Sequence, residues 1–204
     1  MGMHKFFHDL IKNWQYLKVP FRQEWYSEEQ LQNLVNTYQL IRQLEGAVVE
    51  IGCWEGKSTV ALANACYPET LIAVDHWLGN IEEDRKHLTV QILKNTDVFL
   101  RFKRNIQLLT KGNVEIVKRD CFEFLSSVQQ KIKFCHIDAC HDYFSVKKTI
   151  ELLLPKMVGQ SIICGDDYQT AHKERKDLNG GVQQAVMDLL KGHQHIKNFW
   201  YWQK

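Results

Sequence analysis

Residues 48–58 read VVEIGCWEGKS, and this stretch decides the fold of the chain. A short apolar run that leads through an acidic residue and two glycines is typical of a buried strand that turns directly into a helix. Glycine lets the backbone turn sharply and approach a ligand closely, and the amides at the start of a helix are free hydrogen-bond donors. The stretch therefore predicts a strand–loop–helix unit that binds a nucleotide-like cofactor.

A second carboxylate completes the expected cofactor pocket. Asp75 ends the apolar run Leu71–Asp75, and a carboxylate at the end of the second strand can accept hydrogen bonds from both ribose hydroxyls. Gly52 and Gly56 stand four residues apart, whereas a dinucleotide-binding loop reads G-x-G-x-x-G. This spacing favours S-adenosylmethionine, which has no phosphate, so the loop would face its sulfonium and amino-acid tail.

Strands and helices alternate from residue 48 onward, which predicts an α/β fold with a doubly wound, mostly parallel sheet. The expected strands are Val48–Ile51, Leu71–Asp75, Val114–Lys118, Phe134–Asp138 and Ser161–Gly165. The expected helices are Ser58–Cys66, Asp97–Leu109, Cys121–Val128, Tyr143–Leu154 and Gly181–Leu190. Ligands of such sheets bind at the carboxyl ends of the strands.

We expect a single domain, in which residues 46–204 form the cofactor-binding core and residues 1–45 form a helical extension packed on it. Ser27 and Gln30 read as a capping box, and apolar residues follow at helical spacing. The aromatic residues ahead of this helix either pack in the core or cover a substrate pocket; they are Trp14, Tyr16, Phe21, Trp25 and Tyr26. The aromatic tail 196–202 predicts a short C-terminal strand or hairpin.

Net charge and cysteine spacing limit the classes of function. The formal net charge is only +2 at pH 7, and no basic stripe is visible, so we expect no nucleic-acid partner. The six cysteines form no C-x-x-C pair, which favours reduced thiols over a zinc site. No run approaches the length of a membrane span, and the N-terminus lacks the apolar core of a signal peptide. We therefore expect a cytoplasmic protein with no membrane contact.

Five segments at the strand ends resemble, in order, the motifs of class I S-adenosylmethionine-dependent methyltransferases. They are VVEIGCWEGKST (48–59), AVDHWLGN (73–80), VKRDCFEFL (117–125), HIDACHDYFSVKKTIELLLPKM (136–157) and GQSIICGDDY (159–168). More narrowly, they are similar to a small bacterial group that includes macrocin-type O-methyltransferases and cephalosporin-hydroxylase-like proteins. The resemblance implies a Rossmann-like fold and a role in natural-product tailoring. Trp54 and Ala139 depart from this pattern, because the family usually has glycine there.

The resemblance assigns cofactor contacts to residues of the first four strand ends. The expected set is Glu50, Gly52, Cys53, Trp54, Gly56, Ser58, Asp75, His76, Asp120, Cys121 and Asp138. The glycine loop would hold the methionine end, Asp75 the ribose, His76 or Trp77 the adenine face, and Asp120 with Cys121 the adenine edge. Asp120 also directly precedes a helix, so it is expected to cap that helix.

His141 and Asp138 are the expected catalytic residues, because methyl transfer to oxygen requires a group that removes the proton of the acceptor. Histidine is suited to this step near neutral pH. Asp138, Asp166 and Asp167 would repel one another without a hard cation, and an oxygen-only set suits magnesium. In catechol-type and macrocin-type relatives, equivalent positions hold a divalent ion, so the resemblance implies Mg²⁺-assisted O-methylation. Alternatively, Asp166 or Asp167 only caps its turn.

The sequence thus predicts O-methylation of a small hydroxylated metabolite, either a sugar or a phenol. Two alternatives are a non-catalytic S-adenosylmethionine-binding regulatory protein and a hydroxylase-like relative that uses iron. The loops 76–97 and 168–181 are expected to line the acceptor pocket, because long loops in compact domains are usually functional. A homo-oligomer is a further expectation, with the aromatic N-terminal segment and the terminal strand as its interfaces.

Overall fold

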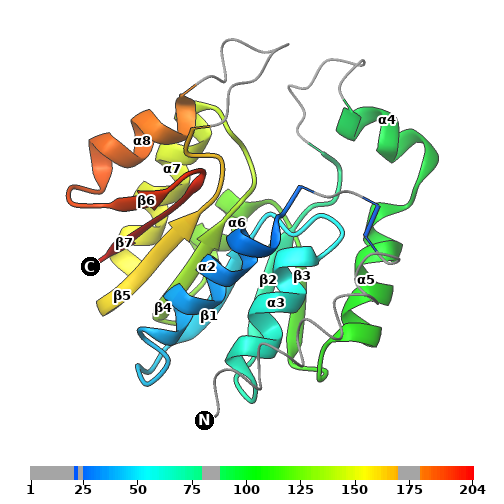
Figure 1. Cartoon of the computed structure of the whole chain (residues 1–204), viewed down its shortest axis with the longest axis horizontal. Helices are drawn as coiled ribbons and strands as arrows, with labels where there is room; N and C mark the ends of the chain where they lie inside the picture. Colours follow the sequence, from blue (N-terminus) through cyan, green and yellow to red (C-terminus); the bar gives the residue numbers. More distant parts are fainter. Residues whose placement is uncertain (1–20, 23–24, 80–87, 170–179) are drawn as a thin grey trace.

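The computed structural model describes residues 21–22, 25–79, 88–169 and 180–204 (Figure 1). Its described part contains a seven-stranded sheet in the order β3-β2-β1-β4-β5-β7-β6. The strands are β1 (Ala47–Ile51), β2 (Leu71–Asp75), β3 (Val114–Lys118), β4 (Ile132–Ile137), β5 (Met157–Gly165), β6 (Gln194–Ile196) and β7 (Phe199–Gln203). Strands β1 to β5 run parallel, whereas β7 is antiparallel to both β5 and β6. The predicted doubly wound, mostly parallel sheet is confirmed.

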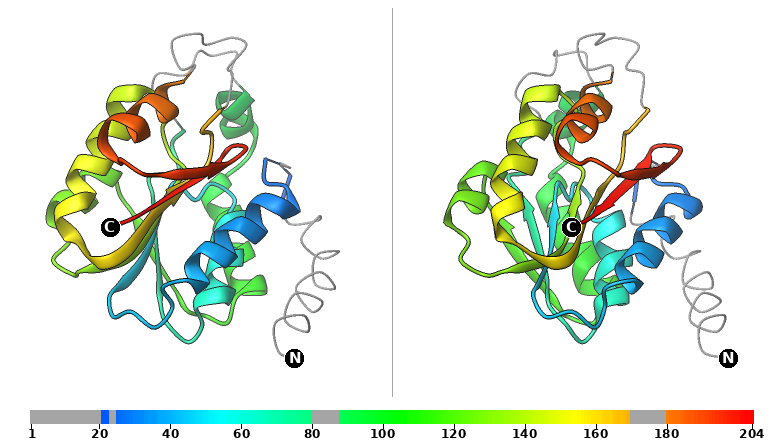
Figure 2. Two further views of the ribbon diagram at one scale, coloured as in Figure 1. Left: turned by 60° about the vertical axis from the view of Figure 1, so that its left-hand side comes forward. Right: turned by 90° about the vertical axis from the view of Figure 1, so that its left-hand side faces the viewer.

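Helices cover both faces of the sheet (Figure 2). They are α2 (Glu28–Gln39), α3 (Lys57–Cys66), α4 (Leu88–Asn95), α5 (Val98–Leu109), α6 (Cys121–Ser127), α7 (Tyr143–Leu153) and α8 (Gly181–Leu189), with a short 3-10 turn at Leu154–Lys156. Apolar residues of α2, α3 and α5 pack on one face, and those of α6, α7 and α8 pack on the other. Helix α4 lies within the segment that the sequence predicted as a loop.

The core follows from the alternation of side chains along the strands. In β1, Val48 packs with residues of α2 and α3, whereas Val49 packs with residues of α6, α7 and α8. Both valines are almost fully buried, because a parallel sheet between two helical layers has no solvent-facing side. The same alternation directs Glu50 and His136 toward the α2 face.

The described part of the N-terminal extension contributes apolar side chains to the core. Ser27 and Gln30 form the predicted capping box, which fixes the start of α2. The predicted apolar face is buried against α3 and the sheet, through Leu31, Leu34, Val35 and Tyr38 of α2 and through Ile41 just after its end.

The C-terminal tail forms a hairpin, which is one of the two predicted forms. Strand β7 pairs with β5, and Trp200 is buried at this junction. The Trp200 indole N–H donates to the carbonyl oxygen of Asp166 over 3.1 Å. This bond ties the hairpin to the turn that follows β5.

The structure also shows the state of the cysteines and the length of the helices. All six cysteines are free thiols. Among the described residues, no helix combines the length and the apolar character needed to cross a membrane.

Candidate functional site

The turns after β1, β2 and β4 meet at the carboxyl edge of the sheet. The Gly52 amide donates to the carbonyl of Val74 over 2.9 Å, and the Asp138 amide donates to the carbonyl of Ile51 over 2.8 Å. Gly52 has a φ of +84°, and a Cβ at this position would overlap the backbone carbonyl of Asp138. Glycine is therefore required here both for its conformation and for the close approach of two turns.

Asp75 braces the glycine loop with both of its carboxylate oxygens. Its Oδ2 accepts hydrogen bonds from the amides of Cys53 (2.8 Å) and Trp54 (3.0 Å), and its Oδ1 accepts from the amide of Trp77 (2.6 Å). Trp54 has a φ of +46°, and its carbonyl accepts from the Trp77 indole over 2.9 Å. The sequence missed this bracing role, because no local pattern links Asp75 to the amides of an earlier loop. Its contact with a ribose stays a prediction.

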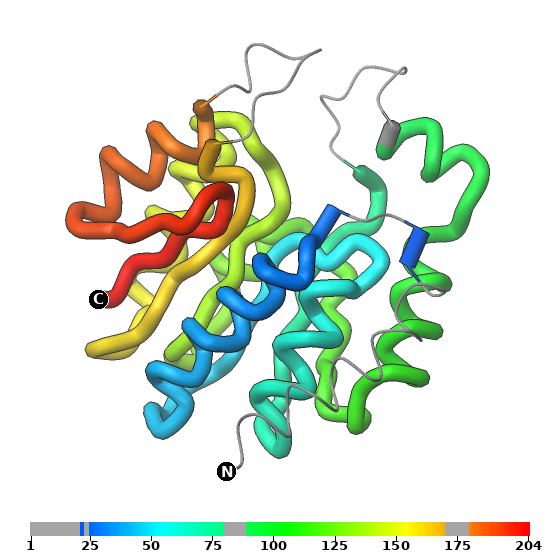
Figure 3. Tube along the Cα trace, viewed as in Figure 1, coloured from blue at the N-terminus to red at the C-terminus, as the bar shows by residue number. Residues whose placement is uncertain are grey.

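A small cavity lies between the glycine loop and the segment that precedes α2. Its walls are Phe21, Trp25, Tyr26, Cys53, Trp54, Glu55, Lys57, Ser58 and Asp138. The described residues of this segment lie beside the turn after β1 (Figure 3). The cavity therefore has an aromatic wall that comes from the N-terminal extension.

Three contacts hold this aromatic wall in place. The Lys57 ammonium donates to the carbonyl of Tyr26 over 2.6 Å, and the Arg22 amide donates to Glu55 Oε2 over 2.7 Å. The rings of Trp25 and Trp54 lie 5.5 Å apart, so the Trp54 indole turns toward the wall. Phe21, Trp25 and Tyr26 thus line the cavity, and Phe21 and Tyr26 are also buried. Trp14 and Tyr16 lie outside the described residues.

Glu50 does not lie in the glycine loop but is buried beneath it. Its Oε1 is 3.1 Å from Nδ1 of His136 on the neighbouring strand, and both side chains are fully buried. Its Oε2 is buried without a hydrogen-bond partner. The contact of Glu50 with the cofactor stays a prediction, and its observed partner is His136.

His136 is linked to Asp138 through the hydroxyl of Tyr26. This hydroxyl donates to Asp138 Oδ2 over 2.7 Å and lies 3.4 Å from His136 Nε2. Burial alone would lower the pKa of His136, but the hydrogen bond to Glu50 and the nearby carboxylates outweigh it, so this pKa is raised. Glu50, His136 and Tyr26 therefore form a buried chain of polar groups that ends at the partly buried Asp138.

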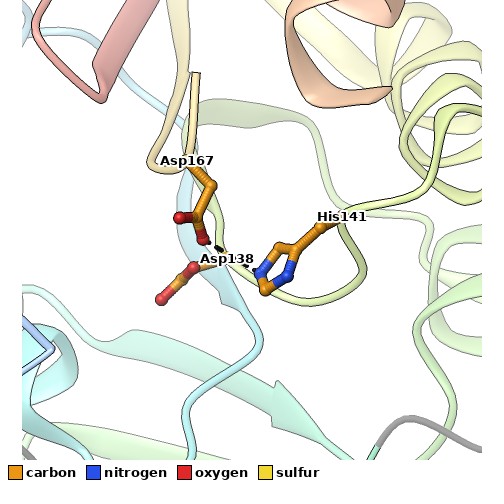
Figure 4. Close-up of side chains that lie close together, drawn as sticks. All are labelled: Asp138, His141 and Asp167. Atoms are coloured by element: carbon orange, nitrogen blue, oxygen red, sulfur yellow. Dashed lines mark ion pairs between the residues drawn. The ribbon is translucent and has the colours of Figure 1, made fainter. Parts of the chain in front are cut away.

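Asp138, His141 and Asp167 lie close together at the turns after β4 and β5 (Figure 4). His141 Nε2 is 3.0 Å from Asp167 Oδ2. Each of the three residues offers one ligand atom, and these atoms all lie within 4.8 Å of one another. Asp167 has a φ of +61°, which is uncommon for a residue with a side chain.

The group that the structure brings together contains Asp138 and Asp167 of the predicted metal set but not Asp166. A metal role of Asp166 stays a prediction, and its Oδ2 instead accepts a hydrogen bond from Gln30 Nε2 over 2.6 Å. Its Oδ1 is buried without a hydrogen-bond partner. His141 takes the place of Asp166, so the candidate ligands are two carboxylates and one imidazole. The sequence missed this because side-chain direction at a turn does not follow from spacing.

Burial and neighbouring charge change the acidity of the carboxylates. Burial raises the pKa of Asp138 to about 7, and the charges of Asp167 and Asp166 add to this effect. The pKa of Asp166 is also raised, first by burial and then by the charge of Asp167. A divalent cation would relieve this repulsion. The donor set fits such an ion, since carboxylates suit Mg²⁺ and Mn²⁺ and imidazole is a common metal ligand.

The remaining predicted cofactor residues lie along the same edge. Asp120 caps α6, because its Oδ1 accepts from the amides of Phe122 (2.8 Å) and Glu123 (3.2 Å). Cys121 is the first residue of that helix. His76 Nδ1 accepts from the amide of Leu78 over 3.0 Å. The capping role of Asp120 is confirmed, whereas the adenine contacts of all three residues stay predictions.

The two loops that were expected to line the acceptor pocket are described only in part. Residues 80–87 of the first loop and 170–179 of the second lie outside the described residues. The described end of the first loop contains α4, and the described start of the second contains Tyr168. Their role at the acceptor stays a prediction.

Comparison with known proteins gives a family and a common fold. Residues 49–168 match a family described as a methyltransferase domain. No curated protein sequence matches the chain. Among solved structures, a putative caffeoyl-CoA O-methyltransferase from Staphylococcus aureus superposes with a TM-score of 0.66 at 17% identity, over 98% of this chain and 97% of that chain.

Two further solved structures share the fold. The O-methyltransferase NovP has a TM-score of 0.62 at 17% identity, over 85% of this chain and 78% of that chain. The O-methyltransferase TomG from Streptomyces achromogenes, solved with S-adenosylmethionine, has a TM-score of 0.60 at 14% identity, over 91% of this chain and 83% of that chain. At these identities the likeness shows the fold alone.

Proposed function

Because the chain belongs to the methyltransferase domain family and is therefore an S-adenosylmethionine-dependent methyltransferase, we propose that it methylates a hydroxyl oxygen of a small metabolite. The observation that carries this proposal is the position of Asp138. This residue lines the cavity beside the glycine loop and also belongs to the group with His141 and Asp167. Asp138 would therefore belong both to the cofactor pocket and to the cluster of side chains that can accept a proton.

The cavity supports binding of the amino-acid end of the cofactor. Helix α3 begins after Gly56, which has no side chain to cap the amides of its first turn. Lys57 and Ser58 line the cavity at this helix start, where a carboxylate is favoured. Asp75 would accept hydrogen bonds from the ribose while it braces the loop.

The reaction needs a positioned hydroxyl and a proton acceptor. The bond between the cofactor sulfur and its methyl carbon breaks as the acceptor oxygen bonds to that carbon, and the hydroxyl proton passes to the protein. His141 and Asp138 are the proposed proton acceptors. Asp138 suits this role near neutral pH, because burial raises its pKa to about 7. Asp167 would orient His141 through their 3.0 Å contact.

A divalent cation fits the proposed chemistry. Asp138, His141 and Asp167 would hold it, and Mg²⁺ or Mn²⁺ there would lower the pKa of the acceptor hydroxyl, so that with the cation bound the reaction would no longer need Asp138 or His141 as the proton acceptor. One imidazole with two carboxylates differs from the two histidines and one carboxylate of non-haem iron oxygenases. The donor set therefore gives no support to the iron hydroxylase alternative.

The structural neighbours support two classes of acceptor. One is named a caffeoyl-CoA O-methyltransferase, and another a TDP-rhamnose 3'-O-methyltransferase of calicheamicin biosynthesis. Phenols and nucleotide-linked sugars are thus the acceptors to test first. We accordingly propose that the protein acts in the cytoplasm and serves natural-product tailoring.

An acceptor screen tests the proposal. The protein is mixed with S-adenosylmethionine and panels of phenols and nucleotide sugars, and S-adenosylhomocysteine formation is followed by mass spectrometry. We expect formation that depends on one acceptor class, and a loss of at least about 100-fold in the double variant Asp138→Asn, His141→Gln. Full turnover by this variant contradicts the assigned roles. Activity that is indifferent to EDTA rejects the cation.

A further inference from the structure

We propose that Tyr26 is a positioning residue of the active site, which aims the Asp138 carboxylate at the cation through its hydroxyl. This inference rests on the proposed function, because it assumes the cation at Asp138, His141 and Asp167. Through Tyr26, the N-terminal extension would contribute to the active site.

Contacts of both its backbone and its side chain hold Tyr26 in place. Tyr26 directly precedes Ser27, whose capping box fixes the start of α2. The Tyr26 side chain is 7% exposed, and its backbone carbonyl accepts a hydrogen bond from Lys57 of the glycine loop. Its hydroxyl reaches Asp138 Oδ2 over 2.7 Å, across 112 residues of sequence. Both ends of this residue are therefore anchored to the cofactor-binding edge.

The side chains of Glu50 and His136 lie behind Tyr26 and explain why its hydroxyl is held in one direction. Glu50 and His136 are partners in the register of β1 and β4, and both are fully buried. Glu50 holds Nδ1 of the imidazole over 3.1 Å, which leaves Nε2 facing the Tyr26 hydroxyl at 3.4 Å. His136 Nε2 thus lies against the hydroxyl on one side, while the hydroxyl donates to Asp138 on the other.

The hydroxyl leaves Asp138 able to bind a cation. A carboxylate has about four lone-pair sites on its two oxygens, and Tyr26 uses one of them. Groups that hydrogen-bond a metal-binding carboxylate fix its orientation, and their loss typically lowers metal affinity by about 10- to 100-fold. Gln30, also from the extension, holds Asp166 in a similar way over 2.6 Å. Without the Tyr26 hydroxyl, the partly buried Asp138 carboxylate would lose the 2.7 Å hydrogen bond that holds its Oδ2.

Tyr38 supplies a matched control. It is a fully buried tyrosine in the same core cluster, and its hydroxyl donates to a carboxylate oxygen of Glu69 over 2.7 Å. Tyr38→Phe therefore removes the same chemical group from the same environment, but away from Asp138. Both variants are expected to fold, because phenylalanine keeps the ring and its packing.

The test measures Mn²⁺ binding by the whole chain, using calorimetry and the electron paramagnetic resonance of free Mn²⁺, with S-adenosylhomocysteine binding measured in parallel. We expect Tyr26→Phe to weaken Mn²⁺ binding by about tenfold or more, while Tyr38→Phe binds as the wild type does. Equal Mn²⁺ affinity in Tyr26→Phe and wild type overturns the inference, as does an equal loss in Tyr38→Phe.

The parallel measurement separates this inference from the proposed function. A wild type that binds S-adenosylhomocysteine but no Mn²⁺ overturns the inference and leaves methyl transfer standing. A wild type that binds Mn²⁺ with the expected Tyr26 dependence but no S-adenosylhomocysteine supports the inference and contradicts the proposed function.

Discussion

The carbonyl oxygen of Asp138 occupies the space where a side chain on Gly52 would begin. The turns after β1 and β4 are therefore in backbone contact. Because Gly52 also has a φ of +84°, the close approach and the left-handed conformation depend on the same missing Cβ.

Gly52→Ala is expected to be strongly destabilising. The methyl group would overlap backbone atoms that cannot rotate away, so we expect a loss of at least about 3 kcal/mol in the free energy of unfolding. Gly112 has a similar φ of +78°, but a Cβ there would meet no heavy atom within 4 Å. Gly112→Ala should cost only about 1 kcal/mol, for its conformation alone. Urea denaturation of both variants checks the difference, and equal losses would show that the two turns are not in tight contact.

Asp138 should make the cation-free protein less stable as the pH rises. Its pKa is raised from the ordinary carboxyl range to about 7 in the folded chain. Below about pH 4 the group is protonated in both states, so its contribution to stability is fully present. That contribution is lost as the pH rises toward and through 7, because the charged form is disfavoured by burial and by neighbouring carboxylates.

Asp138→Asn removes this titration and keeps an oxygen that can accept from Tyr26. In EDTA at pH 8 we expect the variant to be more stable than the wild type by roughly 2 kcal/mol, with the gap closing by pH 4. Urea denaturation across this range measures the gap. A wild type that gains stability relative to the variant between pH 4 and pH 8 would contradict the raised pKa.

Glu55 should stabilise the chain by joining the extension to α5. It is 2% exposed, it lies 3.2 Å from Arg101 Nε, and it accepts from the Arg22 amide. Glu55→Gln would remove the negative charge that faces the partly buried Arg101 guanidinium at 3.2 Å, so we expect a loss of about 2 kcal/mol. Glu123→Gln, at an exposed pair with Arg119, should change stability by less than about 0.5 kcal/mol. Thermal unfolding compares them, and similar shifts would argue against this role of Glu55.

The sequence predicted the strands and helices well where apolar periodicity was clear. Strands β2 and β3 have the predicted bounds, and α5 and α7 differ by one residue at one end. Strand β5 begins four residues before the prediction, at Met157, because its first residues include Gly159 and the exposed Gln160 and so break the apolar run. Periodicity identifies the buried part of a strand, whereas its exposed end is set by backbone pairing.

Side-chain partners at the site were harder to predict. The capping box at Ser27 and the N-cap at Asp120 follow from spacing of a few residues, and both are present. By contrast, the bond from Tyr26 to Asp138 joins two segments that only the folded sheet brings together. The exchange of Asp166 for His141 depends on side-chain direction within two turns. Local sequence rules contain neither kind of information.

The carboxyl edge of the sheet is proposed to bind S-adenosylmethionine rather than a dinucleotide. Calorimetry with S-adenosylhomocysteine and with NADH tests this binding most directly. The four-residue spacing of Gly52 and Gly56 favours the first ligand and disfavours the second. We predict saturable one-to-one binding of S-adenosylhomocysteine, weakened at least about tenfold in Asp75→Ala, and no binding of NADH. Binding of NADH without binding of S-adenosylhomocysteine would contradict the claim.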